Sequence, residues 1–397
     1  MPAWVEYGLS DTFRQGDSRG AYSIAFARRA EEIEAALRAA EELAASSFQH
    51  RLWLETWFAT AGRQPHIRPL LVTLRDEMRG QMAMLLPLIE LRERGLRVVE
   101  FADLGVTDYN APLLGPAAPR CSESAGRLWD ALIRALPAVD AIRLTKMPGE
   151  IAGRPNPLAL LRASRRSPLH GHVLSLISYD EFRSARGRMG RKEIDRSWRV
   201  FRRLGGTDFL NLADPEEALA ILDCMERQQR RRIESVGLAY SLDAPPIAGF
   251  YRKLIVDGLG CGYVVVTALR AGREVVAALL GIRTGSRFTI LRICNAGERW
   301  KACSPGRLVI TRTIEALCAQ GVTTFDFTTG DYEFKRRLGA RRDDLFELTL
   351  ARSWLGVPMV AKAAARGHMS RYPRFVSRVQ RLLRPYAEGA GLMMAQP

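Results

Sequence analysis

The chain has 397 residues, 47% of them hydrophobic and 26% charged, with 59 Lys and Arg against 43 Asp and Glu and a formal net charge of +16. This composition excludes a disordered or fibrous chain, and the length exceeds one ordinary core and predicts two domains. The excess of positive charge favours an anionic partner, which leaves nucleic acid, nucleotide phosphates, membrane lipid and acidic polymers as candidates.

Cysteine, histidine and apolar patterns limit the compartment and argue against a metal site. The six cysteines form no C-x-x-C pair, which is typical of a protein in a reducing compartment. His170 and His172 could share a strand face, but no nearby cysteine or carboxylate completes a ligand set, so we expect no metal. The N-terminus shows no leader pattern, and no apolar run reaches the roughly 18 residues of a membrane span. We therefore expect a cytoplasmic protein.

The first half of the sequence predicts two helices ahead of a group of strands. Alternating apolar runs indicate strands, and apolar stripes at 3.6-residue spacing indicate helices. The predicted order is strand 21–27, helices 31–45 and 49–60, strands 67–74, 81–91 and 98–102, helix 123–136 and strand 141–145. The segment D-L-G-V-T-D-Y-N-A-P-L-L-G-P, before the third helix, is too rich in Gly, Pro, Asp and Asn for a regular element.

The second half repeats this order, and L-V-T-L-R in the first half matches V-V-T-A-L-R in the second, which indicates an internal duplication. Its predicted elements are strand 172–177, helices 215–235 and 246–257, strands 263–269, 274–282 and 287–295, helix 306–319 and strand 323–328. We expect one domain at 1–150 and a second at 172–353, joined by a linker at 151–171 that is rich in Pro, Gly and Arg.

Two segments carry basic faces. In residues 179–204 the apolar side chains keep helical spacing, and the many Arg side chains fall on the other face, where they are either simply solvated or available to an anion. The tail at 354–397 is typical of a basic amphipathic helix. Such a helix would either fold back onto the body or lie on an anionic membrane, in which case the protein would be peripheral to the inner face of the membrane.

A strand, a glycine turn and a short helix are predicted for residues 322–340, V-T-T-F-D-F-T-T-G-D-Y-E-F-K-R-R-L-G-A. Asp331 would cap the helix, and Gly339 would close it in a left-handed conformation. Phe334 and Leu338, four positions apart, would face the core. The same spacing places a phenol, an ammonium and a guanidinium together on the outer face, where they would suit an anionic ligand: Tyr332, Lys335 and Arg336.

Five segments together resemble a known family. They are F-Q-H-R-L-W-L-E-T-W-F, T-D-Y-N-A-P-L-L, the Arg-rich helix ending R-R-L-G-G, S-P-G-R-L, and F-D-F-T-T-G-D-Y-E-F-K-R-R-L-G-A. In this order they are similar to the GNAT-like acyltransferase family named after the cellulose-biosynthesis protein CelD, a relative of the Fem-type aminoacyl transferases. The resemblance implies an α/β fold of two tandem GNAT-like domains with mixed central sheets, and an active site in the cleft between them.

The resemblance also implies an acyltransferase that moves an acyl group from acetyl-CoA or another acyl-CoA to an amine or hydroxyl of an envelope sugar or polysaccharide precursor. GNAT folds bind the donor diphosphate at a helix N-terminus. In this chain the matching positions are Arg299, Ser304, Gly306 and Arg307. The F-K-R-R-L-G segment resembles the F-K-x-x-F-G ending of Fem-type enzymes, which implies that Lys335, next to Arg336, contacts donor phosphates. Its replacement by alanine would then weaken donor binding and leave the fold intact.

Acyl transfer needs a base for the nucleophile and a proton donor. Asp108, in a loop similar to the family's S/T-D-Y, and Asp326 are candidate bases, and Tyr109 and Tyr332 are candidate proton donors. Asp108 could equally be a turn former, and Asp326 the partner of a neighbouring arginine. Two other functions stay open: a Fem-like transferase that uses aminoacyl-tRNA, for which the basic surface would bind tRNA, and a non-catalytic binding protein that keeps the fold.

Overall fold

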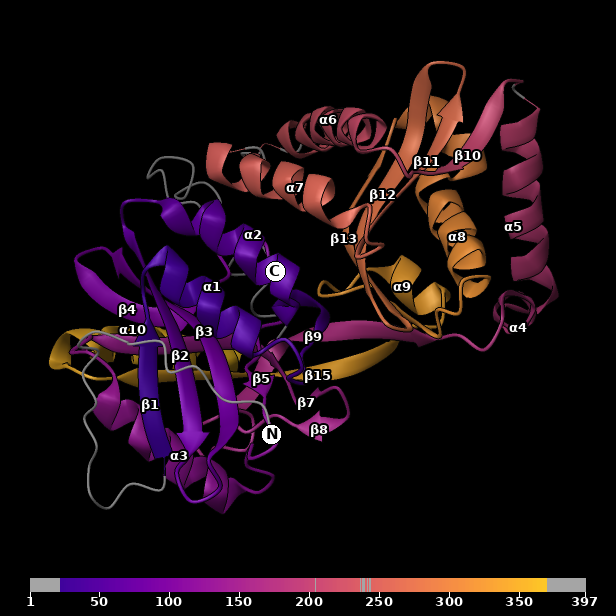
Figure 1. Ribbon diagram of the computed structural model, residues 1–397. Helices are drawn as coiled ribbons and strands as arrows, with labels where there is room; N and C mark the ends of the chain where they lie inside the picture. Colours follow the sequence, from indigo (N-terminus) through magenta and orange to yellow (C-terminus); the bar gives the residue numbers. More distant parts are fainter. Residues whose placement is uncertain are drawn as a thin grey trace, which may run out of the picture.

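The computed structural model describes residues 22–203, 205–235, 237, 240, 242 and 244–369. Two lobes, each a twisted sheet with helices packed on it, are joined through two long strands in the middle of the molecule (Figure 1). We call the lobe that contains the first six strands the first half, and the other lobe the second half.

From residue 22 on, where the structure describes it, the first half contains six strands, three helices and two short 3-10 helices. The strands are β1 (Tyr22–Ala27), β2 (Ile67–Asp76), β3 (Gln81–Glu93), β4 (Leu96–Phe101), β5 (Leu113–Leu114) and β6 (Ala141–Pro148). The helices are α1 (Ala30–Ala39), η1 (Ser47–Gln49), α2 (Arg51–Ala59), η2 (Ala61–Arg63) and α3 (Ser122–Ala135). A small hairpin of β7 (Glu150–Ile151) and β8 (Arg154–Pro155) follows.

The second half begins after a long strand, β9 (Arg165–Ser175). Its helices are α4 (Tyr179–Ser184), α5 (Gly187–Arg202), α6 (Pro215–Glu234), α7 (Pro245–Gly258), η3 (Glu298–Cys303), α8 (Pro305–Cys318) and α9 (Glu333–Arg337). Its strands are β10 (Thr207–Asn211), β11 (Val264–Ala271), β12 (Glu274–Thr284), β13 (Arg287–Asn295) and β14 (Thr324–Asp326). The described chain ends with β15 (Arg341–Ala351), η4 (Trp354–Gly356) and α10 (Val357–Met369).

The two halves share one strand order, as the sequence predicts. In the first half β1, β2, β3 and β4 are antiparallel neighbours and β4 is parallel to β6. In the second half β10, β11, β12 and β13 are antiparallel neighbours and β13 is parallel to β14. In each half one helix, α3 or α8, connects the two parallel strands. The predicted duplicated α/β architecture with mixed sheets is therefore confirmed, although the sequence analysis predicted neither β10 nor β15.

The strand that follows each half pairs in the other half. β9 follows the first half but pairs with β14, and β15 follows the second half but pairs with β6. β9 and β15 also pair with each other, so the sheets of both halves form one continuous sheet (Figure 1). Residues 165–171, which the sequence analysis assigns to a linker, form the first part of β9.

One of the three apolar cores belongs to both halves. It lies between the sheet and α1, α2, α6 and α7, whereas α3 covers a core of the first half and α5 and α8 cover a core of the second. Trp53 of α2 is at the centre of the shared core. Its ring meets Phe48 and Phe250 edge to face, at centroid distances of 5.0 and 4.8 Å. An aromatic chain therefore holds α2 of the first half against α7 of the second.

The predicted amphipathic tail is described only in part. Its first helical segment is α10, and residues 370–397 lie outside the described residues, so membrane binding by the tail stays a prediction. Within the described part of the chain, no helix combines the length and apolar character needed to cross a bilayer.

Two tryptophan substitutions test the shared core. Trp53 is 0% exposed, so Trp53→Ala should lower the free energy of unfolding by about 3 to 5 kcal/mol. Trp354→Ala, at a position 81% exposed, is the matched control and should change it by less than about 0.5 kcal/mol. Urea unfolding measures both, and equal effects would contradict the assignment of Trp53 to a core between the halves.

Candidate functional site

The loop after β4 meets the end of β14 where the two halves face each other. The Tyr109 hydroxyl donates a hydrogen bond to Asp326 Oδ1 at 2.8 Å, and the Thr329 hydroxyl donates one to Asp108 Oδ1. The structure therefore brings together three of the four predicted catalytic residues, from segments more than 200 positions apart in sequence.

An ammonium group of the first half braces this loop. Lys146 Nζ lies 2.7 Å from both Asp103 Oδ2 and the Thr107 carbonyl oxygen, and Asp103 Oδ1 accepts hydrogen bonds from the amides of Gly105 and Thr107. Lys146 has a left-handed backbone conformation, with φ of 59°. A non-glycine residue in that region is strained, and such strain gathers at functional sites. The bracing fixes the position from which Asp108 and Tyr109 reach the second half.

Asp326 is a fully buried carboxylate with three hydrogen-bonding partners. Arg287 donates to Oδ2 at 2.7 Å, and the Thr328 amide and the Tyr109 hydroxyl donate to Oδ1, both at 2.8 Å. Burial raises the pKa of the Asp326 carboxyl, and Arg287 is the main opposing influence. Burial and the adjacent carboxylate raise the pKa of Tyr109 well above its ordinary value. Of the two interpretations of Asp326 in the sequence, this geometry matches the partner of an arginine.

A glycine of β9 makes room for the tyrosine. A Cβ atom on Gly171 would lie 2.6 Å from the Tyr109 hydroxyl oxygen and 3.2 Å from its ring. The neighbouring His172 is fully buried, with its Nε2 atom 3.7 Å from Asp331 Oδ1. Burial, followed by the charge of Lys335, lowers the pKa of His172. Sequence reasoning missed Gly171 and Arg287 as site residues, because nothing local marks them.

Lys335 is buried, so the prediction that it lies on the outer face of its helix is wrong. Its side chain is 3% exposed, and Nζ donates to the carbonyl oxygens of Phe327, Thr328 and Thr329 at 2.7, 3.2 and 2.6 Å. The reason is that α9 has only five residues and the lysine side chain reaches back to the carbonyl oxygens of the preceding turn. Burial lowers the pKa of Lys335 to about 8, against the opposing effect of nearby carboxylates.

The other predictions for this turn have mixed outcomes. Tyr332 is 54% exposed and Arg336 is exposed, as predicted, and Leu338 is buried while Phe334 is half-buried. Gly339 closes the turn with φ of 80°, as predicted. The predicted cap is wrong, because the Asp331 carboxylate makes ion pairs with two arginines instead of accepting from the helix amides: Arg336 and Arg342.

The predicted donor residues lie at and before the N-terminus of α8, which begins at Pro305. Ser304 precedes the helix with a left-handed φ of 48°, and Gly306 lies in the first turn. Arg307 pairs with Glu193 at 2.7 Å, and Arg299, on η3, pairs with a second glutamate, Glu274, at 3.2 Å. The structure therefore groups Ser304, Gly306 and Arg307, whereas Arg299 is engaged elsewhere on the surface.

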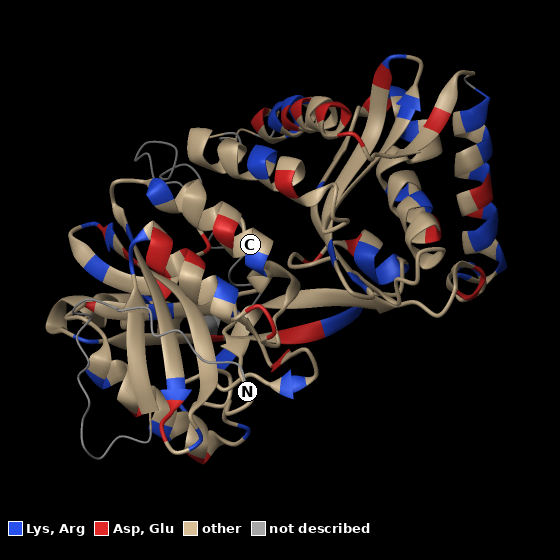
Figure 2. Cartoon of the chain, viewed as in Figure 1, with Lys and Arg blue, Asp and Glu red and all other residues tan. Residues whose placement is uncertain are grey.

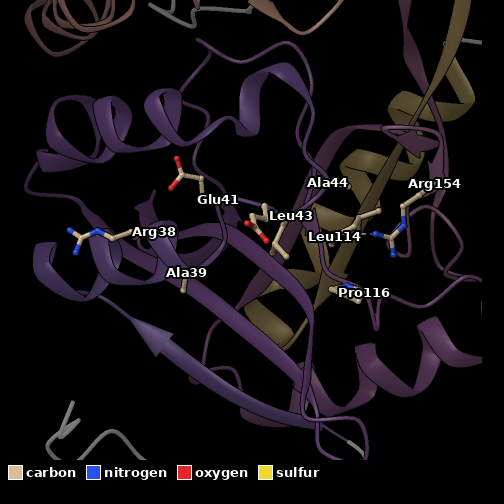
Figure 3. A pocket seen from close by; sticks show the side chains of 9 residues that line it. Arg38, Ala39, Glu41, Leu43, Ala44, Leu114, Pro116 and Arg154 are labelled. Atoms are coloured by element: carbon tan, nitrogen blue, oxygen red, sulfur yellow. Dashed lines mark hydrogen bonds between the residues drawn. The ribbon is translucent and has the colours of Figure 1, made fainter. Parts of the chain in front are cut away.

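A hollow of about 570 Å³ lies apart from these residues, on the first half (Figure 3). Its lining residues are Arg38, Ala39, Glu41, Glu42, Leu43, Ala44, Leu114, Pro116 and Arg154. None of the predicted site residues lines it, and in Figure 3 the Arg154 guanidinium turns toward Leu114, whose carbonyl oxygen it contacts at 3.3 Å. The hydrogen-bonded cluster between the halves is the better candidate site, because it contains buried charges and strained backbone.

In the described part of the chain, no three His, Cys, Asp or Glu side chains are grouped to hold a metal ion.

Comparisons with known proteins agree with the fold. Residues 188–336, from α5 to α9, match the family described as an acetyltransferase (GNAT) domain. FemX has a similar structure, with a TM-score of 0.53 and 11% identity over 81% of this chain and 96% of FemX. L-PGS from Bacillus licheniformis is similar with a TM-score of 0.51 and 14% identity, over 82% of this chain and 94% of that protein. No curated protein matches the sequence.

The fold is therefore the predicted tandem GNAT-like α/β fold, and residues 188–336 of its second half are similar to an acetyltransferase (GNAT) domain. The two matches cover 81% and 82% of this chain, so the likeness extends into both of its halves. The narrower resemblance to the CelD family stays a prediction.

Two tyrosine substitutions test the contact between the halves. Tyr109→Phe removes one donor from a buried carboxylate, so we expect a loss of about 1 to 3 kcal/mol in the free energy of unfolding. Tyr332→Phe changes an exposed ring and is the control, with an expected effect below about 0.5 kcal/mol. Denaturant unfolding measures the free energy of unfolding of both variants. An unchanged free energy for Tyr109→Phe would contradict a stabilising role of the hydrogen bond from Tyr109 to Asp326.

The ammonium of Lys335 should give stability a characteristic pH dependence. Lys335→Met leaves three carbonyl oxygens without a donor, so we expect a loss of about 2 to 4 kcal/mol at neutral pH. The pKa of Lys335 is about 8 in the folded protein against an ordinary value of 10.5, so the folded state releases the proton first. The unfolded state then binds more protons between these two pH values, and stability rises with pH there.

The difference between parent and Lys335→Met should therefore widen by about 3 kcal/mol from pH 8 to pH 10.5. Unfolding curves at a series of pH values measure it. Parallel stability profiles for the two proteins would show that the lysine is not desolvated in the folded state.

Proposed function

We propose that the protein is an acyltransferase that moves an acyl group from acetyl-CoA or another acyl-CoA to an amine or hydroxyl of an envelope sugar or polysaccharide precursor. The observation that carries this proposal is the meeting of Asp108 with Thr329, beside the buried Lys335, at the inner end of the domain that matches the acetyltransferase family. A carboxylate from one half thereby faces the strand ends of the other.

The diverging strands of the second half support an acyl donor with a long arm. β13 and β14 are paired only from Arg287 to Thr289, and β13 continues to Asn295 with β12 on one side but without β14 on the other. Backbone groups along such a gap can bind an extended pantetheine chain through hydrogen bonds. The gap leads from the candidate site toward the N-terminus of α8.

The N-terminus of α8 has the features that a diphosphate needs. First-turn amides such as those of Gly306 and Arg307 have no partner within a helix, and the helix dipole favours an anion. A Cβ atom on Gly306 would have only Asn295 Nδ2 within 4 Å, at 3.6 Å, so the approach is open. The Arg307–Glu193 pair lies at the surface, where ion pairs are weak enough to be exchanged for a phosphate.

The chemistry assigns separate roles to the residues of the site. Asp108, which is half-buried, takes a proton from the acceptor, and the freed nitrogen or oxygen attacks the thioester carbonyl carbon. The carbon–sulfur bond breaks, and the coenzyme A thiolate leaves and takes a proton from the exposed Tyr332. Tyr109 and Asp326 hold the loop in place, because the tyrosine hydroxyl is already donated to the buried carboxylate.

A Fem-like transferase that uses aminoacyl-tRNA is the second candidate, and the similarity to FemX over both halves favours it. The engagement of Lys335 by three carbonyl oxygens weighs against direct contact of its ammonium with donor phosphates. A non-catalytic binding protein with this fold is the third. We propose that the protein lies in the cytoplasm or at the inner face of the membrane, as the acyl-CoA donor also implies.

Donor binding and thiol release test the proposal. Gly306→Asp sets a carboxylate against the diphosphate, so the affinity for acetyl-CoA should fall by about tenfold or more. Gly126→Asp is the matched control, because Gly126 occupies the same G-R-L motif in α3 and a Cβ atom there would meet nothing within 4 Å. Asp108→Asn should keep donor affinity and slow acyl transfer to amino sugars by about 100-fold or more.

Thermal shift measures donor binding, with acetyl-CoA and bulk tRNA compared for every variant. A shift by acetyl-CoA that Gly306→Asp removes and Gly126→Asp keeps supports the acyl-CoA donor. A shift by tRNA alone would favour the Fem-like function, and a donor shift without thiol release in the parent would favour the binding protein.

A further inference from the structure

A long basic face covers the outer side of α5, at the edge of the second half (Figures 1 and 2). Seven exposed side chains form it: Arg188, Arg191, Lys192, Arg196, Arg199, Arg202 and Arg203. At 3.6 residues per turn these positions fall within an arc of about 140° along a helix about 24 Å long. We call this set the α5 basic face.

The charges of the α5 basic face are compensated only in part, because one carboxylate, that of Asp195, falls within the same arc. The helix carries two acidic residues, and both are engaged by arginines outside it, at 2.7 Å each: Asp195 by Arg183, and Glu193 by Arg307. Among the described residues, none of the seven basic side chains has a carboxylate partner within ion-pair distance. A concentration of like charges in one stripe costs folding energy and attracts anions.

The neighbourhood of the face identifies the kind of anion. Trp198, the aromatic residue at its flank, is covered by the guanidinium of Arg312 at 4.0 Å and by that of Arg202 at 5.7 Å, so its ring is not free to stack on nucleic-acid bases. Met189 stands beside Arg196 on the helical wheel and is 81% exposed. Ile177, also 81% exposed, leads into α4, which packs against α5.

Exposed apolar side chains next to a row of basic side chains fit a lipid bilayer better than a polynucleotide. A phosphate backbone offers nothing for Met189 to contact, whereas the boundary between lipid headgroups and acyl chains does. The α5 basic face also runs along one side of a helix about 24 Å long, which matches an extended surface rather than a groove. We propose that the α5 basic face docks the protein on an anionic lipid bilayer, with Met189 entering the interface.

Vesicle sedimentation of the full chain tests this contact. The parent should bind vesicles of phosphatidylcholine with phosphatidylglycerol at low salt, bind phosphatidylcholine alone much more weakly, and lose binding as salt screens the charges. Each basic residue near an anionic surface raises the partition coefficient by about fivefold. A combined variant with Arg191→Gln, Lys192→Gln, Arg196→Gln and Arg199→Gln should therefore partition about 100-fold or more weakly.

The matched control neutralises four exposed basic residues of the first half, which leaves the same net charge: Arg68→Gln, Arg75→Gln, Arg92→Gln and Arg120→Gln. It should keep at least about a tenth of the parent's partition coefficient, because only the general charge is reduced. Met189→Ser should lower the binding that persists at high salt. Equal thermal unfolding of the parent and the three variants shows that the fold is unchanged.

Three results would overturn the proposal. The first is equal vesicle binding by the α5 variant and the parent, which would move the contact to another part of the chain. The second is binding that does not depend on phosphatidylglycerol. The third is a loss of tRNA binding in the α5 variant while vesicle binding is unchanged, which would make the face a nucleic-acid contact.

Discussion

The buried carboxylate of Asp326 is the constraint on which the arrangement of the site depends. A carboxylate without access to water is costly unless every oxygen has a donor and a cation lies near. Here the donors come from three segments, Arg287 of β13, the Thr328 amide and the hydroxyl of Tyr109. The last of these belongs to the other half, so satisfying one charge fixes the loop of the first half against the strand ends of the second.

Each half uses a lysine to hold the backbone that faces this contact. Lys146 ties the loop of the first half through Asp103 and a carbonyl oxygen, and Lys335 gathers the three carbonyl oxygens after β14. Each half also has a strained non-glycine residue there, Lys146 with φ of 59° and Thr328 with φ of 57°. The duplicated fold has therefore kept the same kind of brace in both halves, with different donors and acceptors.

The order of elements is predictable because helix and strand periodicity is local. The start of α8 at Pro305 and the turn at Gly339 also follow from neighbouring residues alone. The exchange of β9 and β15 is not predictable in this way, because which edge a strand joins depends on distant segments. The burial of Lys335 is unpredictable for a related reason, since a five-residue helix has no dependable inner and outer face when its side chains reach back to the preceding turn. For the same reason Tyr109 could be chosen as a candidate from its motif, while Gly171, which makes room for it, could not.

The strand exchange has a consequence for how the chain folds as it leaves the ribosome. β6 ends at Pro148, and its outer neighbour is β15, which begins at Arg341. A nascent first half therefore keeps an open sheet edge while almost 200 further residues are made. Open edges invite wrong pairing, and contacts this distant in sequence form slowly. The sheet closes only when β15 has emerged, so both lobes reach their final form together.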